Sequence, residues 1–165
     1  VTRDLRVVRW RGGEKELLSG FGQEAYNWRA TACSADGSVI VGQRWPVGTT
    51  PLDGRGLGFR WEDGQVETLG DLFGGEIQSA AHAVSASGRW VVGSSQTASG
   101  ETAFVWDSEH GMRLLQEVLR QRGADVRGWH LMSALAVSAD GTHIAGYGRN
   151  LDGDLEIFLA RISAE

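Results

Sequence analysis

Acidic side chains offer the first candidate chemistry. Asp152, Asp154 and Glu156 alternate along one short segment, and calcium binds several carboxylate oxygens on flexible loops. Because the segment lacks the full ligand set of known calcium loops, we expect a solvated turn there, with calcium binding as the alternative. Asp36 and Asp140 each precede a glycine, a spacing at which the carboxylate usually bonds backbone N–H groups of its own turn. We therefore expect turns at both positions.

The histidines and serines give no catalytic or metal-binding pattern. The four histidines form no His-x-x-x-His or Glu-x-x-His pair, so we expect no metal and no cofactor. His82 lies in a run of small residues, where it could line a channel at the centre of the fold. Ser34, Ser85 and Ser138 recur with the repeat described below, which favours turn hydrogen bonding over nucleophilic catalysis. No Gly-x-Ser-x-Gly elbow is present, and we assign no catalytic residue.

Tryptophans are the better candidates for ligand contact. Three of the seven, Trp10, Trp61 and Trp106, recur with the repeat and are expected to pack in the core. Trp45 and Trp129 lie outside that phase, and an aromatic face exposed near a loop can stack on a sugar or seat a protein partner. The candidate ligand-binding residues are Trp45, Arg44, Asp53, Arg55, Trp129 and His82.

A sequence motif that occurs three times predicts the strands and turns that position these residues. Its copies cover residues 32–42, 83–93 and 136–146, and their turn glycines, Gly37, Gly88 and Gly141, are 51 and 53 positions apart. Each copy reads as a strand of small residues, a tight turn with glycine, a β-branched strand and a closing glycine. A hairpin repeated at this period is typical of the blades of a β-propeller.

A second half completes each unit. It consists of an aromatic strand, a turn and a strand that ends in leucine, as in residues 58–69. We predict an all-β, β-propeller-like array of four-stranded antiparallel blades, with the strand of small residues innermost. Helical spacing of apolar residues predicts one short helix near 116–122. The single repeat domain, 1–165, divides into units at about 30–79, 80–132 and 133–162, after a partial unit at 1–29.

Composition agrees with this fold and excludes several function classes. The chain has 165 residues, 24 glycines and only 2 prolines, as expected for many short strands joined by tight turns. A net charge of −5 without a basic run disfavours nucleic-acid binding. No apolar run is long enough for membrane insertion, and no signal peptide opens the chain. The single cysteine, Cys33, makes no internal disulfide, and we expect a small buried side chain there.

The number of repeats raises the question of closure. About three units are fewer than the four blades that complete the smallest propellers, and an open array leaves sheet faces and strand edges uncovered. We expect that two chains associate head-to-tail as a homodimer that completes a ring of about six blades. The alternative is that the chain is a piece of a longer protein whose other blades complete the ring.

The repeat resembles the HAF repeat family, probable bacterial extracellular repeat proteins. The resemblance lies in the Ala-x-x-Ser-x-Asp-Gly-x-x-x-x-Gly half and in the half with Ala103-Phe104 and Trp106. Residues 57–59 and 156–158 depart further from the family's His-Ala-Phe. The resemblance implies a propeller-like fold and a secreted or cell-surface location, and it implies no catalytic residues.

Function is then expected in the parts that do not repeat. Loops 45–58, 94–101 and 149–154 vary in length on a regular scaffold, and such loops usually carry binding. We expect a non-enzymatic module for binding or assembly that recognises a protein or a glycan. One alternative is a glycan-active hydrolase or lyase with its site at a central channel, although the small side chains near the axis disfavour a carboxylate-based centre. A purely structural spacer is the other alternative.

Overall fold

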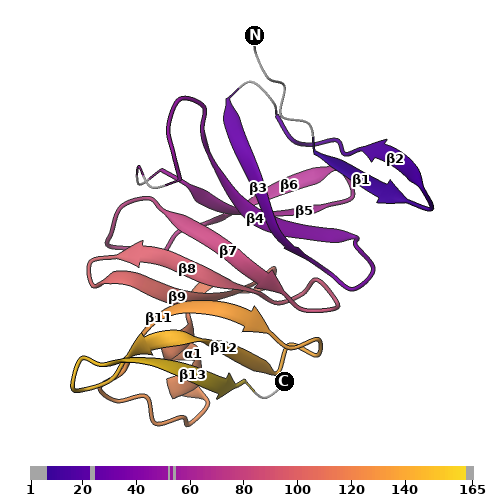
Figure 1. Cartoon of the computed structure of the whole chain (residues 1–165). Coiled ribbons are helices and arrows are strands. Elements are labelled where there is room, and N and C mark those ends of the chain that lie inside the picture. The colour runs from indigo at the N-terminus through magenta and orange to yellow at the C-terminus, as the bar shows by residue number, and fades with distance from the viewer. Residues whose placement is uncertain (1–6, 23–24, 52, 54, 163–165) are drawn as a thin grey trace.

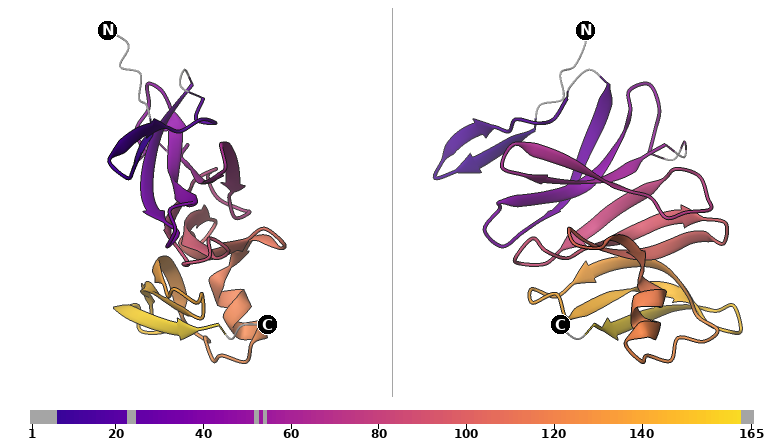
Figure 2. Two further views of the ribbon diagram at one scale, coloured as in Figure 1. Left: turned by 90° about the vertical axis from the view of Figure 1, so that its right-hand side faces the viewer. Right: turned by 180° about the vertical axis from the view of Figure 1, so that it is seen from behind.

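The computed structural model describes residues 7–22, 25–51, 53 and 55–162. Within these residues the chain forms four antiparallel sheets and one short helix (Figure 1). The sheets stack in chain order, and the side and rear views in Figure 2 show the same order. The prediction of an all-β chain with one helix is confirmed, but the described sheets do not form a closed propeller.

The strands follow one another in space as they do in the sequence. The N-terminal hairpin consists of β1 (Val8–Arg11) and β2 (Glu14–Leu17). The first sheet consists of β3 (Tyr26–Cys33), β4 (Val39–Pro46), β5 (Leu57–Glu62) and β6 (Gln65–Gly70). The second sheet consists of β7 (Ser79–Val84), β8 (Val91–Thr97), β9 (Gly100–Asp107) and β10 (Gly111–Leu114). The third sheet consists of β11 (His130–Val137), β12 (His143–Arg149) and β13 (Leu155–Arg161).

The helix α1 (Leu115–Gln121) follows β10 directly and lies one residue earlier than the predicted span. Leu115, Val118 and Leu119 are its buried residues. Their helical spacing places them on one face, which packs between the second and third sheets. The helix therefore fills the outer part of that junction.

Each sheet has a front face, which we define as the one toward the preceding sheet, and a back face toward the following one. In the first junction, Val39 and Val41 on the back of the first sheet form a buried cluster with Val91, Phe104 and Trp106 of the second. Successive side chains of a strand point to opposite faces, so Val92, the neighbour of Val91, points backward. Both faces are buried, which explains the uninterrupted apolar runs in these strands.

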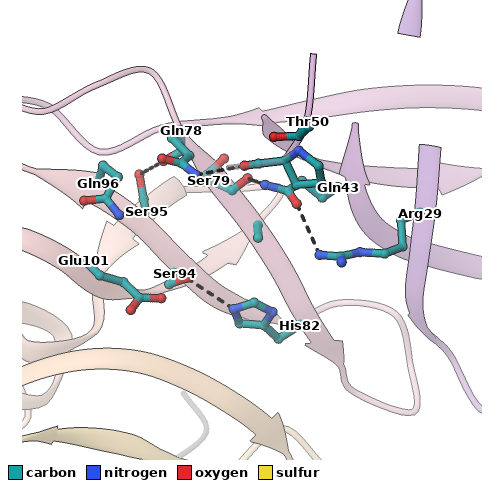
Figure 3. Close-up of a pocket in the computed structure, with 12 residues that line it drawn as sticks. Arg29, Gln43, Thr50, Gln78, Ser79, His82, Ser94, Ser95, Gln96 and Glu101 are labelled. Atoms are coloured by element: carbon teal, nitrogen blue, oxygen red, sulfur yellow. Dashed lines mark hydrogen bonds between the residues drawn. The ribbon is translucent and has the colours of Figure 1, made fainter. Parts of the chain in front are cut away.

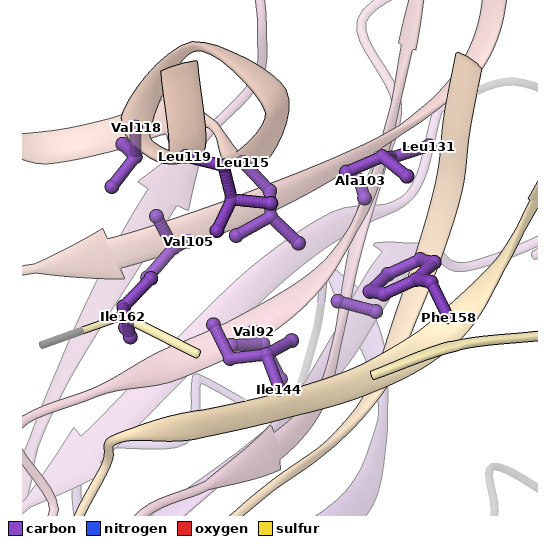
Figure 4. Close-up of a cluster of buried hydrophobic side chains, with 11 residues drawn as sticks. Val92, Ala103, Val105, Leu115, Val118, Leu119, Leu131, Ile144, Phe158 and Ile162 are labelled. Carbon is purple, nitrogen blue, oxygen red and sulfur yellow. The ribbon is translucent and has the colours of Figure 1, made fainter. Parts of the chain in front are cut away.

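The second junction repeats this arrangement. Val92 and Val105 on the back of the second sheet cluster with Ile144 and Phe158 of the third sheet and with Leu119 of α1 (Figure 4). All of these side chains are at least nine-tenths buried. Burial of side chains of this size contributes roughly 1.5–3 kcal/mol each, so the junctions between sheets are the core of the molecule.

The N-terminal hairpin covers only part of the front of the first sheet. Leu18 and Phe21, which follow β2, cluster with Phe59 and Trp61 of β5. The ring centroids of Phe21 and Trp61 lie 6.2 Å apart, and the indole N–H of Trp61 donates to the carbonyl of Ser19 at 2.8 Å. The hairpin thus covers the outer strands and leaves the inner strand β3 largely exposed in front.

Two burial predictions are wrong for this reason. Trp61 and Trp106 are 4% and 3% exposed, as expected, but Trp10 is 66% exposed. No described sheet lies in front of the hairpin, so the tryptophan position that is buried in the first and second sheets is exposed in the hairpin. Cys33 is also exposed, whereas Val84, its counterpart in the second sheet, is buried against the first sheet.

The repeated turns form as predicted. The carboxylate of Asp36 accepts hydrogen bonds from the Ser38 amide at 3.0 Å and from the Ser34 hydroxyl at 2.7 Å, and these bonds hold the pKa of Asp36 well below its usual range. Asp140 makes the same bonds to Ser138 and Thr142, which lower its pKa to about 2.

The turns also join one sheet to the next. The Ala35 amide donates to the Ala86 carbonyl at 3.1 Å, and the Ala86 amide donates to the Ala139 carbonyl at 3.0 Å. These bonds link equivalent positions of all three turns. The stack is therefore held at one end by backbone hydrogen bonds as well as by apolar contacts.

Candidate functional site

Each inner strand carries a β-bulge at the same place. The register shifts between Ala30 and Ala32 in β3, and the equivalent shifts in β7 and β11 leave His82 and Leu135 outside the ladder as Thr31 is in β3. A bulge re-aims the side chain of the extra residue. His82 is thereby directed into a pocket (Figure 3).

This inner pocket lies between the first and second sheets, on the side of the loops that follow β4 and β8. Its volume is about 490 Å³. Most of the side chains that line it are polar, and they come from both sheets (Figure 3). The lining residues with charged, amide or imidazole side chains are Arg29, Gln43, Gln78, His82, Gln96 and Glu101.

A chain of hydrogen bonds crosses the pocket. The Arg29 guanidinium donates to the side-chain oxygen of Gln43 at 3.3 Å, and the Gln43 amide donates to the Ser79 carbonyl at 3.2 Å. Nε2 of His82 lies 3.2 Å from Oγ of Ser94. These bonds connect β3 and β4 to β7 and β8, so the pocket wall is continuous across the junction (Figure 3).

The electrostatics of the pocket favour a neutral histidine. Burial lowers the pKa of His82 below its ordinary value of 6.5, Glu101 opposes this effect, and Arg29 adds to it. At neutral pH the imidazole is therefore a hydrogen-bonding group without charge. Arg29 and Glu101 supply one positive and one negative charge to the same pocket.

Glu101 is held from the third sheet. The Tyr147 hydroxyl donates to its carboxylate at 3.1 Å, and Nε2 of His130 lies 2.8 Å from its backbone carbonyl. Burial raises the pKa of the Tyr147 hydroxyl, and the Glu101 carboxylate adds to this. The orientation of Glu101 thus depends on the packing of the third sheet.

Of the six residues predicted to bind ligand, His82 lines the inner pocket. Trp45 is partly buried on β4, whereas the Arg44 guanidinium stacks 4.1 Å from the ring centroid of Tyr26. Asp53 accepts a hydrogen bond from the Thr50 amide and is exposed, as is Arg55.

Trp129 lies elsewhere, packed against the cluster of the second junction. It also lines a second pocket of about 1070 Å³, which residues of α1 help to form. The structure does not bring the six predicted residues together.

Sequence reasoning missed most of the pocket. Arg29 occupies the position of Ala80 and Ser133 in the other inner strands, and a long cation among small residues was a signal that could have found it. Gln78 and Glu101 lie at strand ends with no such signal, because only the stacking of sheets shows which strand ends meet.

One acidic cluster could suggest a metal. In the described part of the chain, ligand atoms of Asp107, Glu109 and His110 lie within 4.8 Å of one another. However, the Asp107 carboxylate already accepts the amides of Glu109 and His110 at 3.0 Å and also pairs with Arg113. Burial alone would raise the pKa of Asp107, but the hydrogen bond with the His110 ring, the two amide bonds and the charge of Arg113 lower it. The group therefore holds a turn together.

The segment with alternating carboxylates is also a turn. The side-chain oxygen of Asn150 accepts the amides of Asp152 and Asp154 at 2.9 and 3.0 Å, and its nitrogen donates to Glu156 at 2.6 Å. The side chain of Asn150 organises the connection between β12 and β13, and the carboxylates of Asp152 and Asp154 are exposed.

Comparison with known proteins assigns no family. No family model matches the chain, and no curated protein matches it, so the resemblance to HAF repeats stays a prediction. Among solved structures, TolB from Acinetobacter baumannii is similar over 93% of this chain and 39% of that chain, with 12% sequence identity and a TM-score of 0.40. Within the described residues, no helix is long and apolar enough to cross a membrane.

Proposed function

We propose that this chain is a non-enzymatic, propeller-like recognition module that binds a polar ligand, a glycan or a peptide segment, in the inner pocket. The observation that carries the proposal is the polar lining itself, contributed by two sheets at their loop ends. Ligand sites commonly combine a preformed hollow with a few convergent polar groups. The resemblance to HAF repeats supports an extracellular setting, where such ligands occur.

The chemistry of the pocket suits hydroxyl and amide groups. Gln78 and Gln96 each offer a donor and an acceptor, and the neutral His82 offers one of each. Arg29 and Glu101 add charge-assisted hydrogen bonds, which are roughly twice as strong as neutral ones. A ligand with closely spaced donors and acceptors therefore matches this lining.

Catalysis is less well supported. Glycosidases use a pair of carboxylates, and Glu101 is the one carboxylate among the described residues that line the pocket. The contact between His82 and Ser94 favours a second candidate, a hydrolase with a serine nucleophile. Ser94 is buried, however, which leaves its hydroxyl poorly placed for attack on a substrate.

The test is a screen of the purified chain on glycan and peptide arrays, followed by titration calorimetry on each hit. We expect Arg29→Gln and Glu101→Gln to weaken binding about tenfold each, which corresponds to about 1.4 kcal/mol. The exposed pair Arg89→Gln and Glu109→Gln serves as the matched control and is expected to bind like the parent.

Blank arrays, or hits that the pocket variants bind unchanged, would refute a ligand site here. Turnover of an ester or glycan substrate that Ser94→Ala abolishes would support the hydrolase.

A further inference from the structure

The back face of the third sheet is an apolar surface that no other described part of the chain covers. Ile157 and Leu159 of β13 are 86% and 74% exposed. Phe104 of β9 and Phe158 of β13 hold equivalent positions in their sheets. Ile157 and Leu159 therefore correspond to Ala103 and Val105 of the second sheet, which are both 0% exposed. The same face is therefore buried where another sheet follows and open where no described sheet follows.

The front face of the first sheet is also exposed, along its inner strand β3. Ala30 and Cys33 of β3 are exposed, whereas Ala81 and Val84, the equivalent residues of β7, are buried against the first sheet. Ala134, the equivalent of Ala30 in β11, is fully buried against the second sheet. Small residues of an inner strand thus pack on the back of the sheet before it at both internal junctions.

We propose that a second copy of this chain closes these two surfaces, with the back of the third sheet of one copy packed on β3 of the other. Each copy then supplies one half of a junction that the chain already makes twice internally. Association of this kind is head-to-tail, and it closes into a ring when the rotation per sheet permits. The inference does not rest on the ligand pocket.

The end sheets hold fewer described strands than the two inner sheets. The third sheet has three described strands where the first and second have four, and the N-terminal hairpin has two. The hairpin already covers the outer part of the front of the first sheet. The third sheet of a second copy would face the inner part, which the hairpin leaves open.

The test is the molar mass of the chain by sedimentation velocity over a wide concentration range. We expect a dimer in the parent protein and a shift to monomer, with the apparent Kd weakened at least tenfold, in both Leu159→Glu and Ala30→Glu. Both side chains are exposed in the single chain, so folding should be retained, which circular dichroism checks. Phe73→Glu, at an exposed position on neither surface, is the control and should remain dimeric.

Mixing the two variants distinguishes head-to-tail from symmetric association. Leu159→Glu keeps an intact front and Ala30→Glu an intact back, so an equimolar mixture should form a heterodimer through one junction. A parent that is monomeric at every concentration overturns the proposal. Loss of association in Leu159→Glu alone also overturns it, because that result indicates two back faces packed together.

Cys33 reports on the same junction independently. Its thiol is exposed in the single chain, and its counterpart Val84 is 9% exposed at an internal junction. Alkylation of Cys33 should slow at least tenfold as the parent associates and should stay fast in Leu159→Glu. Equal rates at high and low concentration of the parent would contradict a contact at β3.

Discussion

The β-bulge that holds His82 recurs in all three sheets, but the residue in it has a different role in each. The same bulge holds Thr31 in the first sheet and Leu135 in the third. The Thr31 hydroxyl donates to the Ala81 carbonyl at 2.8 Å and thus ties two sheets together, whereas Leu135 is half exposed. Of the three bulge residues, His82 alone has a titratable side chain and lines the inner pocket, so the side chain and not the backbone gives this position its chemistry.

The lowered pKa of His82 predicts a pH dependence of stability. Because the folded state binds this proton less readily than the unfolded state, the contribution of His82 is complete above the unfolded pKa of about 6.5 and declines as pH falls toward the folded pKa. Denaturant unfolding of the parent and of His82→Gln should therefore diverge between neutral and mildly acidic pH. The parent should lose more stability than the variant on acidification.

Parallel curves for the two proteins across this range would show that His82 titrates alike in both states. His143→Gln is a suitable control, because that exposed ring lies on β12 and does not line the pocket.

At the scale of elements, the repeated turn performs two tasks. Its glycine adopts a positive φ, +69° in Gly37, +74° in Gly88 and +77° in Gly141. In the second and third turns the glycine also lets a side chain of the preceding sheet approach closely. A Cβ on Gly88 would overlap Val39, and one on Gly141 would overlap Trp90, whereas one on Gly37 would meet nothing within 4 Å.

This difference predicts the order of three alanine substitutions. Gly37→Ala should cost about 1 kcal/mol, because an L-residue is disfavoured at this φ. Gly88→Ala and Gly141→Ala should cost about 2–4 kcal/mol, since overpacking of a buried junction adds roughly 1–3 kcal/mol. Chemical denaturation at concentrations where the chain is monomeric measures all three. Equal losses would mean that the turns are not held against the neighbouring sheets.

At the scale of the whole molecule, the chain is a linear stack in which each sheet contacts its neighbours in sequence. Stability in such an array is approximately a sum of unit and nearest-neighbour terms. The third sheet has one apolar junction, with the second sheet and α1. The third sheet should therefore unfold before the rest of the stack when this junction is weakened.

Ile144→Ala tests this view. Ile144 is 0% exposed in the second junction, and loss of such a side chain costs about 2–5 kcal/mol. Hydrogen exchange should accelerate across residues 130–161 and much less across 79–107. Val91→Ala, a buried residue of the first junction, is the counterpart and should not act on the third sheet selectively. Uniform acceleration in Ile144→Ala would indicate a single cooperative unit.

Much of the fold follows from local sequence. The turn glycines, the aspartates of the first and third turns and the alternation of strands all act over a few residues, so the repeat predicts them directly. The apolar spacing near 116–122 is a local signal of the same kind, and it predicts the helix after β10 within one residue. His82 stands out in the sequence because it interrupts a run of small residues.

Only the tertiary structure decided which repeated residues are buried and which polar residues meet. Arg9-Trp10 and Arg60-Trp61 are the same dipeptide at the same position of the repeat, yet one tryptophan is exposed and the other is core. Arg29 and Glu101 belong to different sheets and share one pocket. In both cases the environment is set by the neighbouring sheet, because burial and charge proximity depend on what packs across a junction and not on the strand's own residues.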